Sequence, residues 1–376
     1  MEYRLEELFD LQMGKTPSRS VTEYWESGNN KWISIADLSK CGKYIYDTKE
    51  CLSDIAVSES GIKQIPANTV VMSFKLSIGK TAITSEPMYS NEAIMSFRDR
   101  KLVQLLPEYI YYLLLSKNWD DGTNKAVMGK TLNKATLSKV KVNIHSMQEQ
   151  QEIVYVLNQA TALIELHQQQ LQKLDELVKA RFVELFGDPI LNQKQFPVYR
   201  MDEVVEFQGG SQPDKKFFEY EPTDDNIRLI QIRDYKTDKF ITYIPRAMAK
   251  RFCTADDIMI GRYGPPIFQI LQGIEGSFNV ALMKATPKKG NKEFVRQFLK
   301  QECLLDYLEG MSKRTAGQDG IQMDKLKAYP FPLPPVELQN QFEKFANQVD
   351  KSKVAVQKSL DEAQLLFDSL MQQYFG

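Results

Sequence analysis

Two short segments carry side chains that could bind a polar ligand. FKLSIGK (residues 74–80) and RYGPPIF (residues 262–268) each follow an apolar run and contain glycine. Their candidate side chains are those of Lys75, Ser77, Lys80, Arg262 and Tyr263. Loops of this kind can reach base edges in the major groove of DNA, where Arg and Lys donate hydrogen bonds to guanine. We predict that these residues contact DNA; the alternative is an ordinary solvated hairpin.

A second set of polar side chains lies just before the last strand that we expect in each half of the chain. Its members are Lys125, Lys130, Lys134, Lys313, Arg314 and Gln318. Most hydrogen bonds between proteins and DNA go to the backbone and carry no sequence information. We therefore predict phosphate contacts here, with a plain charged surface as the alternative. Arg233, beside Asp234, either reads a base or pairs with its neighbour.

Motifs that would indicate catalysis are missing from the sequence. There is no G-x-G-x-x-G, Walker loop, H-E-x-x-H or G-x-S-x-G, and neither His145 nor His167 has plausible catalytic partners nearby. The 4 cysteines show no C-x-x-C spacing, which disfavours a zinc site or a disulfide framework. We expect a chain without an active site, a metal or a cofactor of its own.

Charge and hydropathy restrict the class of protein further. The net charge is −1, so binding to nucleic acid would depend on local basic patches and not on bulk positive charge. The start of the chain lacks an apolar leader, and the longest apolar run, YIYYLLL (residues 109–115), is too short to span a bilayer. We expect a soluble, cytoplasmic protein with reduced thiols and no membrane partner.

The sequence repeats itself across its two halves. YRLEELFDLQMGKTP (residues 3–17) returns as YRMDEVVEFQGGSQP (residues 199–213), and SIAD, ANTVVMS and NEAIM return as QIRD, ADDIMIG and NVALM. The best agreement lies in two long stretches that align without a gap and end at Gly187 and Gly376. Because solenoid repeats run only about 20 to 50 residues, these repeats are domains. We expect two whole units that arose by duplication.

Each unit changes character once along its length. The first three-quarters contain β-branched runs bounded by turn residues, such as KWISIADL and IRLIQIRDY, mixed with helical pieces such as PEYIYYLLLSK. The last quarter has apolar residues alternately three and four positions apart, from Leu157 to Leu185 and from Ala346 to Tyr374, which is typical of a coiled coil. The pattern predicts α+β globular domains, each followed by one long helix.

A helix of that length would be on the order of 55 to 60 Å long and must pack mainly on another long helix. The simplest partner is its own copy, arranged antiparallel, which gives the chain a pseudo-twofold internal repeat. His167, Arg181 and Lys353 interrupt the apolar positions. They either extend their polar ends to solvent at the edge of the helix pair or fix its register.

Two globular domains on paired helices suit the reading of a split DNA site. Duplex DNA rises about 34 Å per turn, and twofold-symmetric proteins read half-sites spaced accordingly. The two candidate loops differ in sequence, whereas a homodimer would carry identical readers. We therefore expect an asymmetric target in two parts.

The repeat, taken as a whole, resembles the specificity subunit of type I restriction–modification systems along essentially the entire chain. The features that carry the resemblance are the two unit openings, NTVVMSFKLSIGKTAI and DDIMIGRYGPP, LFGDP at residues 185–189, and FPLPPVELQNQF before the second long helix. The first unit departs from the pattern, with VNIHSMQEQQEI where the second has its proline run.

The resemblance implies a division of labour. Target recognition domains would cover residues 1–145 and 188–335, and spacer helices residues 146–187 and 336–376. The helices would dock two methyltransferase (modification) subunits that bind S-adenosylmethionine and methylate adenine. Restriction/translocase subunits, which would carry ATP and Mg, would join for ATP-driven translocation and cleavage. This chain would read double-stranded DNA without catalysing a reaction. The alternative from another class is a coiled-coil protein–protein adaptor with two binding domains.

Overall fold

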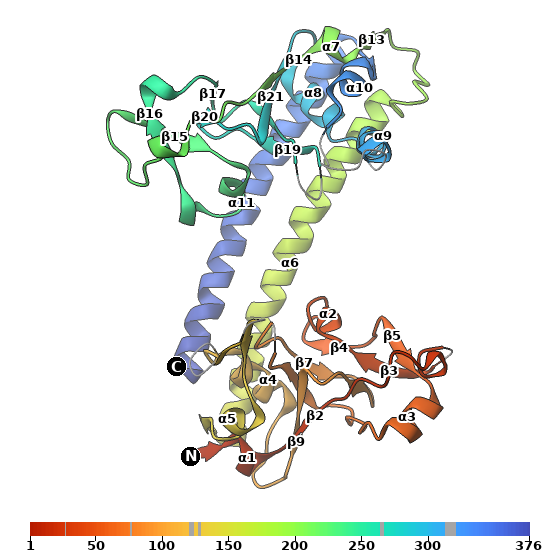
Figure 1. Ribbon diagram of the computed structural model, residues 1–376, viewed down its shortest axis with the longest axis vertical. Helices are drawn as coiled ribbons and strands as arrows, with labels where there is room; N and C mark the ends of the chain where they lie inside the picture. The colour runs from red at the N-terminus through yellow and green to blue at the C-terminus, as the bar shows by residue number, and fades with distance from the viewer. Residues whose placement is uncertain (27, 76, 120–123, 127–128, 264–266, 313–320) are drawn as a thin grey trace. The chain divides into compact units, whose positions relative to one another are not determined.

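The computed structural model describes residues 1–376 except 27, 76, 120–123, 127–128, 264–266 and 313–320 (Figure 1). The chain divides into two compact units. Unit 1 comprises Met1–Gln168 and Lys358–Gly376, and unit 2 comprises Gln169–Gln357. Among the described residues, no helix combines the length and the apolar composition needed to cross a membrane.

Unit 1 contains two main sheets. The larger has the order β2-β9-β6-β7-β4, with strands Phe9–Met13, Ile94–Asp99, Val70–Ser73, Thr81–Thr84 and Tyr44–Ile45. The smaller has the order β5-β3-β8, with strands Glu50–Leu52, Asn30–Ile33 and Tyr89–Ser90. Two further pairs are β1-β12 (Glu2–Arg4 and Lys141–Asn143) and β10-β11 (Asn124–Ala126 and Gly129–Thr131).

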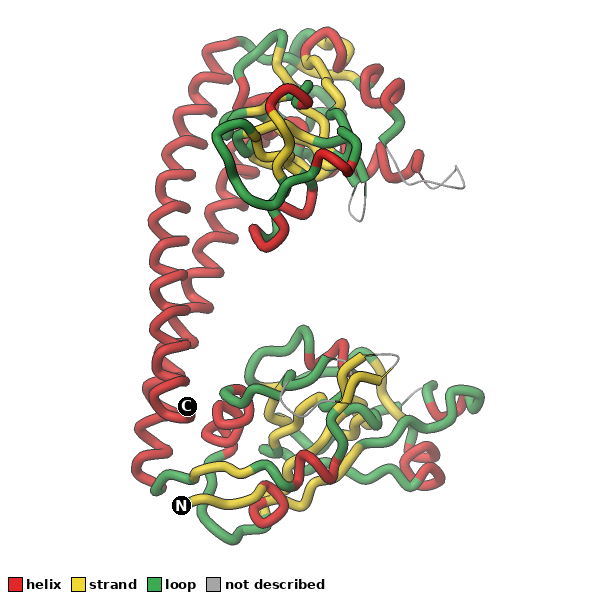
Figure 2. Tube along the Cα trace, turned by 60° about the vertical axis from the view of Figure 1, so that its left-hand side comes forward, coloured by secondary structure: helices red, strands yellow, loops and turns green. Residues whose placement is uncertain are grey.

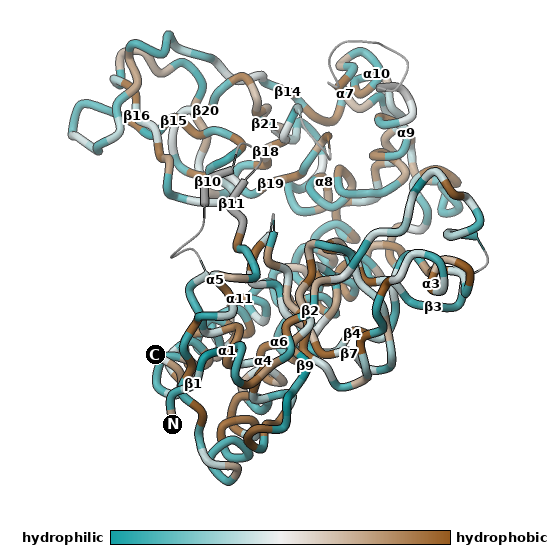
Figure 3. Tube along the Cα trace, turned by 60° about the horizontal axis from the view of Figure 1, so that its bottom comes forward, coloured by the Kyte–Doolittle hydropathy of each residue, from teal (hydrophilic) through white to brown (hydrophobic). Residues whose placement is uncertain are grey.

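Short helices connect these strands. They are α1 (Leu5–Leu8), η1 (Thr22–Tyr24), α2 (Ile35–Leu38), α3 (Asp54–Ser60), α4 (Pro107–Leu115) and α5 (Lys134–Ser138). Helix α4 begins with proline, whose fixed φ suits the first helical position. Its buried side chains, with those of the large sheet, form the core of unit 1. Hydrophobic residues along α4 and the nearby β2 are brown in Figure 3.

Unit 2 repeats this plan with strands of its own. One sheet has the order β14-β21-β18-β19, with strands Val205–Gly209, Leu282–Pro287, Ile258–Gly261 and Gln269–Gln272. The other has the order β16-β15-β20-β17, with strands Tyr243–Pro245, Asn226–Ile230, Gly276–Phe278 and Phe252–Cys253. Strands β13 (Val198–Arg200) and β22 (Pro330–Pro332) pair as β1 and β12 do.

The helices of unit 2 also follow the plan of unit 1. They are α7 (Met201–Val204), η2 (Lys215–Phe217), η3 (Ile232–Tyr235), η4 (Asp238–Phe240), η5 (Arg246–Met248), α8 (Lys292–Leu299), α9 (Glu302–Ser312) and α10 (Met323–Ala328). The predicted α+β class and the internal repeat are confirmed by this shared order of strands and helices.

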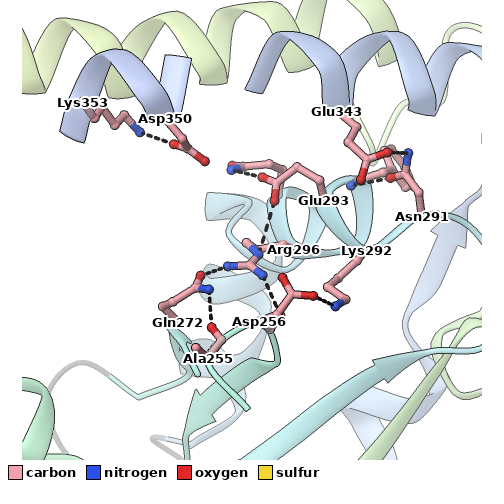
Figure 4. A network of polar contacts seen from close by, with 12 residues as sticks. Ala255, Asp256, Gln272, Asn291, Lys292, Glu293, Arg296, Glu343, Asp350 and Lys353 are labelled. Atoms are coloured by element: carbon pink, nitrogen blue, oxygen red, sulfur yellow. Dashed lines mark hydrogen bonds and ion pairs between the residues drawn. The ribbon is translucent and has the colours of Figure 1, made fainter. Parts of the chain in front are cut away.

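Helix α8 is held by polar contacts on two sides (Figure 4). Arg296 donates to the side chain of Gln272 in β19 and, at 3.2 Å, to the carbonyl oxygen of Asp256. Asn291, the N-cap residue of α8, donates to Glu343 at 3.4 Å. Because Glu343 lies on a long helix, these contacts fix the globular part of unit 2 to that helix.

The two long helices are α6 (Met147–Phe186) and α11 (Val336–Phe375), each of 40 residues, drawn as continuous coils in Figure 2. At about 1.5 Å per residue each is ~60 Å long. In unit 1 the beginning of α6 and the end of α11 share one core, through Leu157 and Met371. In unit 2 the ring of Phe186, at the end of α6, lies 5.5 Å from that of Phe342, near the beginning of α11. These contacts confirm that the helices run antiparallel.

The repeated opening of each unit has the same local structure. The backbone nitrogen of Arg4 donates to Glu7 at 2.6 Å, and that of Arg200 donates to Glu203 at 2.8 Å. Each bond closes a single helical turn, α1 or α7, whose apolar side chains are buried. The repeated sequence therefore encodes a repeated framework.

Candidate nucleic-acid interface

The candidate loop of unit 1 lies at one end of the large sheet. Strand β9 pairs antiparallel with both β2 and β6, with Met13 opposite Met95 and Ser73 opposite Ile94. The segments after β2 and β6 and the turn before β9 must therefore meet at the same end. In sequence these are residues 14–16, 74–80 and 91–93.

Backbone hydrogen bonds lock these segments together in unit 1. The turn begins at Asn91, whose nitrogen donates to the Ile33 carbonyl at 3.1 Å and whose side-chain oxygen accepts from the Ala93 nitrogen at 3.0 Å. Five further backbone bonds complete the arrangement: Ile94 N to Asn91 O at 3.2 Å, Phe74 N to Ala93 O at 3.0 Å, Gly14 N to Ile94 O at 3.1 Å, Lys15 N to Ser90 O at 2.8 Å and Leu132 N to Phe74 O at 3.0 Å.

Unit 2 makes the corresponding bonds with other residues. Asn279 donates to the Ile230 carbonyl at 3.0 Å, and its side-chain oxygen accepts from the Ala281 nitrogen at 3.1 Å. The matching backbone bonds are Leu282 N to Asn279 O at 3.0 Å, Arg262 N to Ala281 O at 2.9 Å, Gly210 N to Leu282 O at 3.1 Å and Ser211 N to Phe278 O at 3.1 Å. We call the shared arrangement the turn frame; it is centred on residues 91–93 in unit 1 and 279–281 in unit 2.

The glycine repeated in both openings is required by the turn frame. A Cβ atom on Gly14 would lie 2.1 Å from the Ser90 carbonyl oxygen, and one on Gly210 would lie 1.9 Å from the Asn279 carbonyl oxygen. Both distances are far below van der Waals contact with a backbone atom that cannot move independently. Any other residue would push the segment after the first strand away from the turn.

Lys75, in the first loop, lies near this turn, because the backbone nitrogen of its neighbour Phe74 donates to the Ala93 carbonyl oxygen. The Lys75 ammonium lies 5.3 Å from the ring centroid of Phe74, and the side chains of Ser77 and Lys80 are exposed. Glu92, at the centre of the turn, is also exposed and accepts a hydrogen bond from the Thr16 hydroxyl. That bond, reinforced by the charge of Lys75, holds the pKa of Glu92 below its ordinary value.

In unit 2 Arg262 contacts the equivalent turn. Arg262 Nη1 donates to the Val280 carbonyl at 3.3 Å, and its guanidinium lies 5.4 Å from the ring of Tyr263, which is exposed. Arg233 belongs to η3, and its Nη2 donates to Thr242 at 3.0 Å while its Nε lies 3.9 Å from Asp234. The structure thus gives Arg233 protein partners, and its contact with a base stays a prediction.

The echo of SIAD in QIRD also has a structural counterpart. Ser34 and Asp37 form a capping box at the start of α2, and Gln231 and Asp234 form one at the start of η3. Asp234 is buried, and this burial raises the pKa of its carboxyl group. A Cβ atom on Gly261, the last residue of β18, would lie 2.9 Å from Cδ1 of Ile232. Ile232 therefore packs beside the end of β18. The capping box therefore borders the turn frame.

The predicted phosphate contacts are only partly described. The backbone register of strands β10 and β11 pairs Lys125 with Lys130. Lys134 is exposed at the first position of α5, after its N-cap Asn133. Lys313, Arg314 and Gln318 lie outside the described residues. These six assignments remain predictions.

Polar side chains that were not predicted from the sequence also lie near this end of unit 1. Arg19 binds Glu50 through both ends of its guanidinium, at 2.5 and 2.9 Å, and lies 3.6 Å from the ring centroid of Trp25. The indole of Trp32 donates to the Lys15 carbonyl at 3.1 Å. Arg19 and Trp25 have no counterparts after the second opening. This difference between the two units was the signal in the sequence that could have identified them.

The chemistry available at both turn frames is that of hydrogen-bond donors, one carboxylate and aromatic faces. Among the residues that the structure describes, no cluster of His, Cys, Asp and Glu could hold a metal ion. Such groups can form hydrogen bonds with the base edges and the phosphates of a nucleic acid.

Comparison with known proteins identifies relatives of this chain. The family model described as type I restriction modification DNA specificity domain matches residues 1–176 and 193–363. The chain is 27% identical over 228 residues to the MjaIX specificity subunit of Methanocaldococcus jannaschii, covering 55% of this chain and 52% of that subunit. It is 27% identical over 195 residues to the EcoR124I/EcoR124II specificity subunit of Escherichia coli, covering 50% and 44%. The chain thus spans about half the length of these curated relatives.

Two solved structures resemble the whole chain. The type I restriction–modification S subunit from M. genitalium matches with a TM-score of 0.55 and 15% identity, covering 100% of this chain and 96% of that chain. A chain from a structure of type I restriction–modification complex assembly matches with a TM-score of 0.50, covering 99% and 96%. At this level of identity the likeness shows a shared fold.

Proposed function

Because this chain belongs to the family of the type I restriction modification DNA specificity domain, which matches residues 1–176 and 193–363, we propose that it reads the DNA sequence for a type I restriction–modification complex. The target is a bipartite, asymmetric site in double-stranded DNA. The observation that carries the proposal is the turn frame: both units build it with the same hydrogen bonds and surround it with different side chains. Because the two turn frames have the same backbone structure but carry different side chains, the two units can recognise two different half-sites.

Under this proposal residues 1–145 and 188–335 are the target recognition domains, and residues 146–187 and 336–376 are the spacer helices. The two helices also dock two methyltransferase subunits. Apolar side chains that stand exposed on the helices support this role; in unit 1 they include Tyr155 at 66% exposure and Leu365 at 71%, and in unit 2 Val354 at 71%. Apolar side chains exposed in this way are available for contact with a partner subunit.

The chemistry of the complex belongs to the partners. Methyltransferase subunits bind S-adenosylmethionine and methylate adenine, and restriction/translocase subunits use ATP and Mg. This chain recognises the target DNA sequence. It does so in the cytoplasm, where host DNA and the partner subunits are present.

The direct test measures DNA binding by the full chain together with its methyltransferase subunits. Duplexes are selected from a random pool by electrophoretic mobility shift and sequenced, and the affinity is then measured between 50 and 200 mM salt, a range over which about six to ten phosphate contacts lower it ~10³- to 10⁵-fold. Enrichment of a two-part motif with such a salt dependence is expected. DNA of unaltered mobility at low salt would favour the protein–protein adaptor instead.

A further inference from the structure

The turn frame presents one residue that differs between the units. We propose that Glu92 and Val280 are specificity-determining residues, one for each half of the target. Glu92 accepts a hydrogen bond from the exocyclic amino group of a cytosine, and Val280 contacts the methyl group of a thymine. The inference rests on the proposed function and names residues within its site.

Both residues occupy the centre of the same Asn-x-Ala turn. The flanking asparagine and alanine are buried or half-buried in each unit, whereas Glu92 and Val280 are exposed, Val280 by 40%. The side-chain oxygen of the asparagine closes the turn onto the alanine nitrogen at 3.0 Å in unit 1 and 3.1 Å in unit 2. Identical bonds on either side give the central Cα–Cβ bond the same direction in both units.

The rest of the frame makes this position rigid. Gly14 or Gly210 abuts the turn from one strand, and Phe74 or Arg262 donates to the turn alanine from another. Because the backbone at this position is held by hydrogen bonds on three segments, it needs no rearrangement on binding, which favours discrimination between bases. The hydrogen bonds that both units share involve the asparagine side chain and backbone groups, and none of them involves the central side chain. That position is therefore free to vary with the target.

The surroundings of Glu92 suit a carboxylate at a DNA surface. The Thr16 hydroxyl donates to its Oε2 atom, and an ionised carboxylate with about four lone-pair sites can accept further bonds. The charge of Lys75, on a neighbouring segment, favours the ionised form of Glu92 and offsets the repulsion between Glu92 and phosphates. A Glu in the major groove characteristically accepts from the N4 amino group of cytosine.

The surroundings of Val280 suit a different base. Its carbonyl oxygen accepts from Arg262 Nη1 at 3.3 Å, so a guanidinium lies at the backbone of this residue. Thymine offers the one methyl group on the major-groove edge, and small apolar side chains contact it. Unit 2 therefore presents an apolar contact next to an arginine, where unit 1 presents a carboxylate next to a lysine.

The test maps methylated adenines in cells that co-express the chain and its methyltransferase subunits. The variants are Glu92→Val, Glu92→Gln, Val280→Glu and, as a matched control, Glu6→Val. Glu6 is exposed on α1, three residues before Phe9, which begins β2, so it lies at the opposite end of that strand from the turn frame. Glu92→Gln retains an acceptor for Thr16 and guards against a variant that merely fails to fold.

We expect each change at residue 92 to alter one base position in one half-site, with preference there falling roughly tenfold to a hundredfold. Glu92→Gln should shift that preference toward adenine, which Gln reads through N6 and N7. Val280→Glu should alter only the other half-site, and Glu6→Val should alter neither. A wild-type two-part motif that all variants keep unchanged overturns this inference alone. A wild-type chain that directs methylation to no motif overturns the proposed function and, with it, the inference.

Discussion

The Lys353 ammonium lies 2.6 Å from a carboxylate oxygen of Asp175, joining α11 to α6 inside unit 2. Lys353 interrupts the apolar positions of its helix, and its side chain is 25% exposed, against 66% for Asp175. The residue therefore extends to the edge of the helix pair and also forms an ion pair across it. A charge pair between antiparallel helices favours one register over its neighbours.

Replacing Lys353 by Met and Asp175 by Asn, singly and together, measures the coupling free energy between the two side chains. Because both groups are partly solvated, we expect a coupling free energy of about 0.5 kcal/mol that weakens in about 1 M salt. Urea unfolding of the four chains gives the double-mutant cycle. Lys351→Met, at an exposed position of the same helix, should show no coupling with Asp175→Asn. A coupling of zero at low salt would rule out the pair as a register contact.

Gln339 is expected to be a major stabilising residue of unit 2. It is 2% exposed, accepts from the Asn291 nitrogen at 2.8 Å and donates to the Pro334 carbonyl at 2.7 Å. Gln339→Ala leaves both backbone groups without this partner and should lower the free energy of unfolding by about 2 kcal/mol. Gln341→Ala, on an exposed position of the same helix, should change it by no more than about 0.5 kcal/mol. Equal effects in thermal unfolding would contradict the buried role of Gln339.

Gly210→Ala should damage the turn frame of unit 2. The new Cβ would lie 1.9 Å from the Asn279 carbonyl oxygen, and relief of such overpacking costs about 1 to 3 kcal/mol. We expect weaker binding to the half-site read by unit 2 and a lower midpoint of thermal unfolding. Gly310→Ala is the control, since a Cβ there, within α9, would meet no atom within 4 Å. It should stabilise the chain by up to about 1 kcal/mol; similar losses in both variants would refute the steric argument.

Cys253 should react slowly with alkylating reagents. It is 3% exposed, and burial raises the pKa of its thiol to about 11. Because the thiolate is the reactive form, its alkylation rate should keep rising with pH well above pH 9, unlike that of an ordinary exposed thiol. Mass spectrometry after timed alkylation reports each cysteine separately. Modification of Cys253 as fast as the half-buried Cys51 at pH 8 would show that the site opens readily.

Much of the fold could be predicted from the sequence because duplication displays it twice. The gap-free stretches ending at Gly187 and Gly376 identified both long helices, and the echo of SIAD in QIRD corresponds to a shared capping box. Antiparallel pairing followed from the need of each apolar stripe for a partner.

The centre of the candidate site could not be predicted in this way. Glu92 and Val280 were visible within NEAIM and NVALM, but their importance depends on which segments β9 and β21 bring beside them. That information is in the strand register. Arg233 shows the same limit, since its contact with Thr242 joins residues on separate elements.

The most direct test of the whole account is a genome-wide map of methylated adenines in cells that express this chain with its methyltransferase subunits. We expect one motif with two half-sites of different sequence, separated by a fixed number of bases of any sequence. A continuous motif, a palindrome or methylation that does not depend on this chain would contradict it.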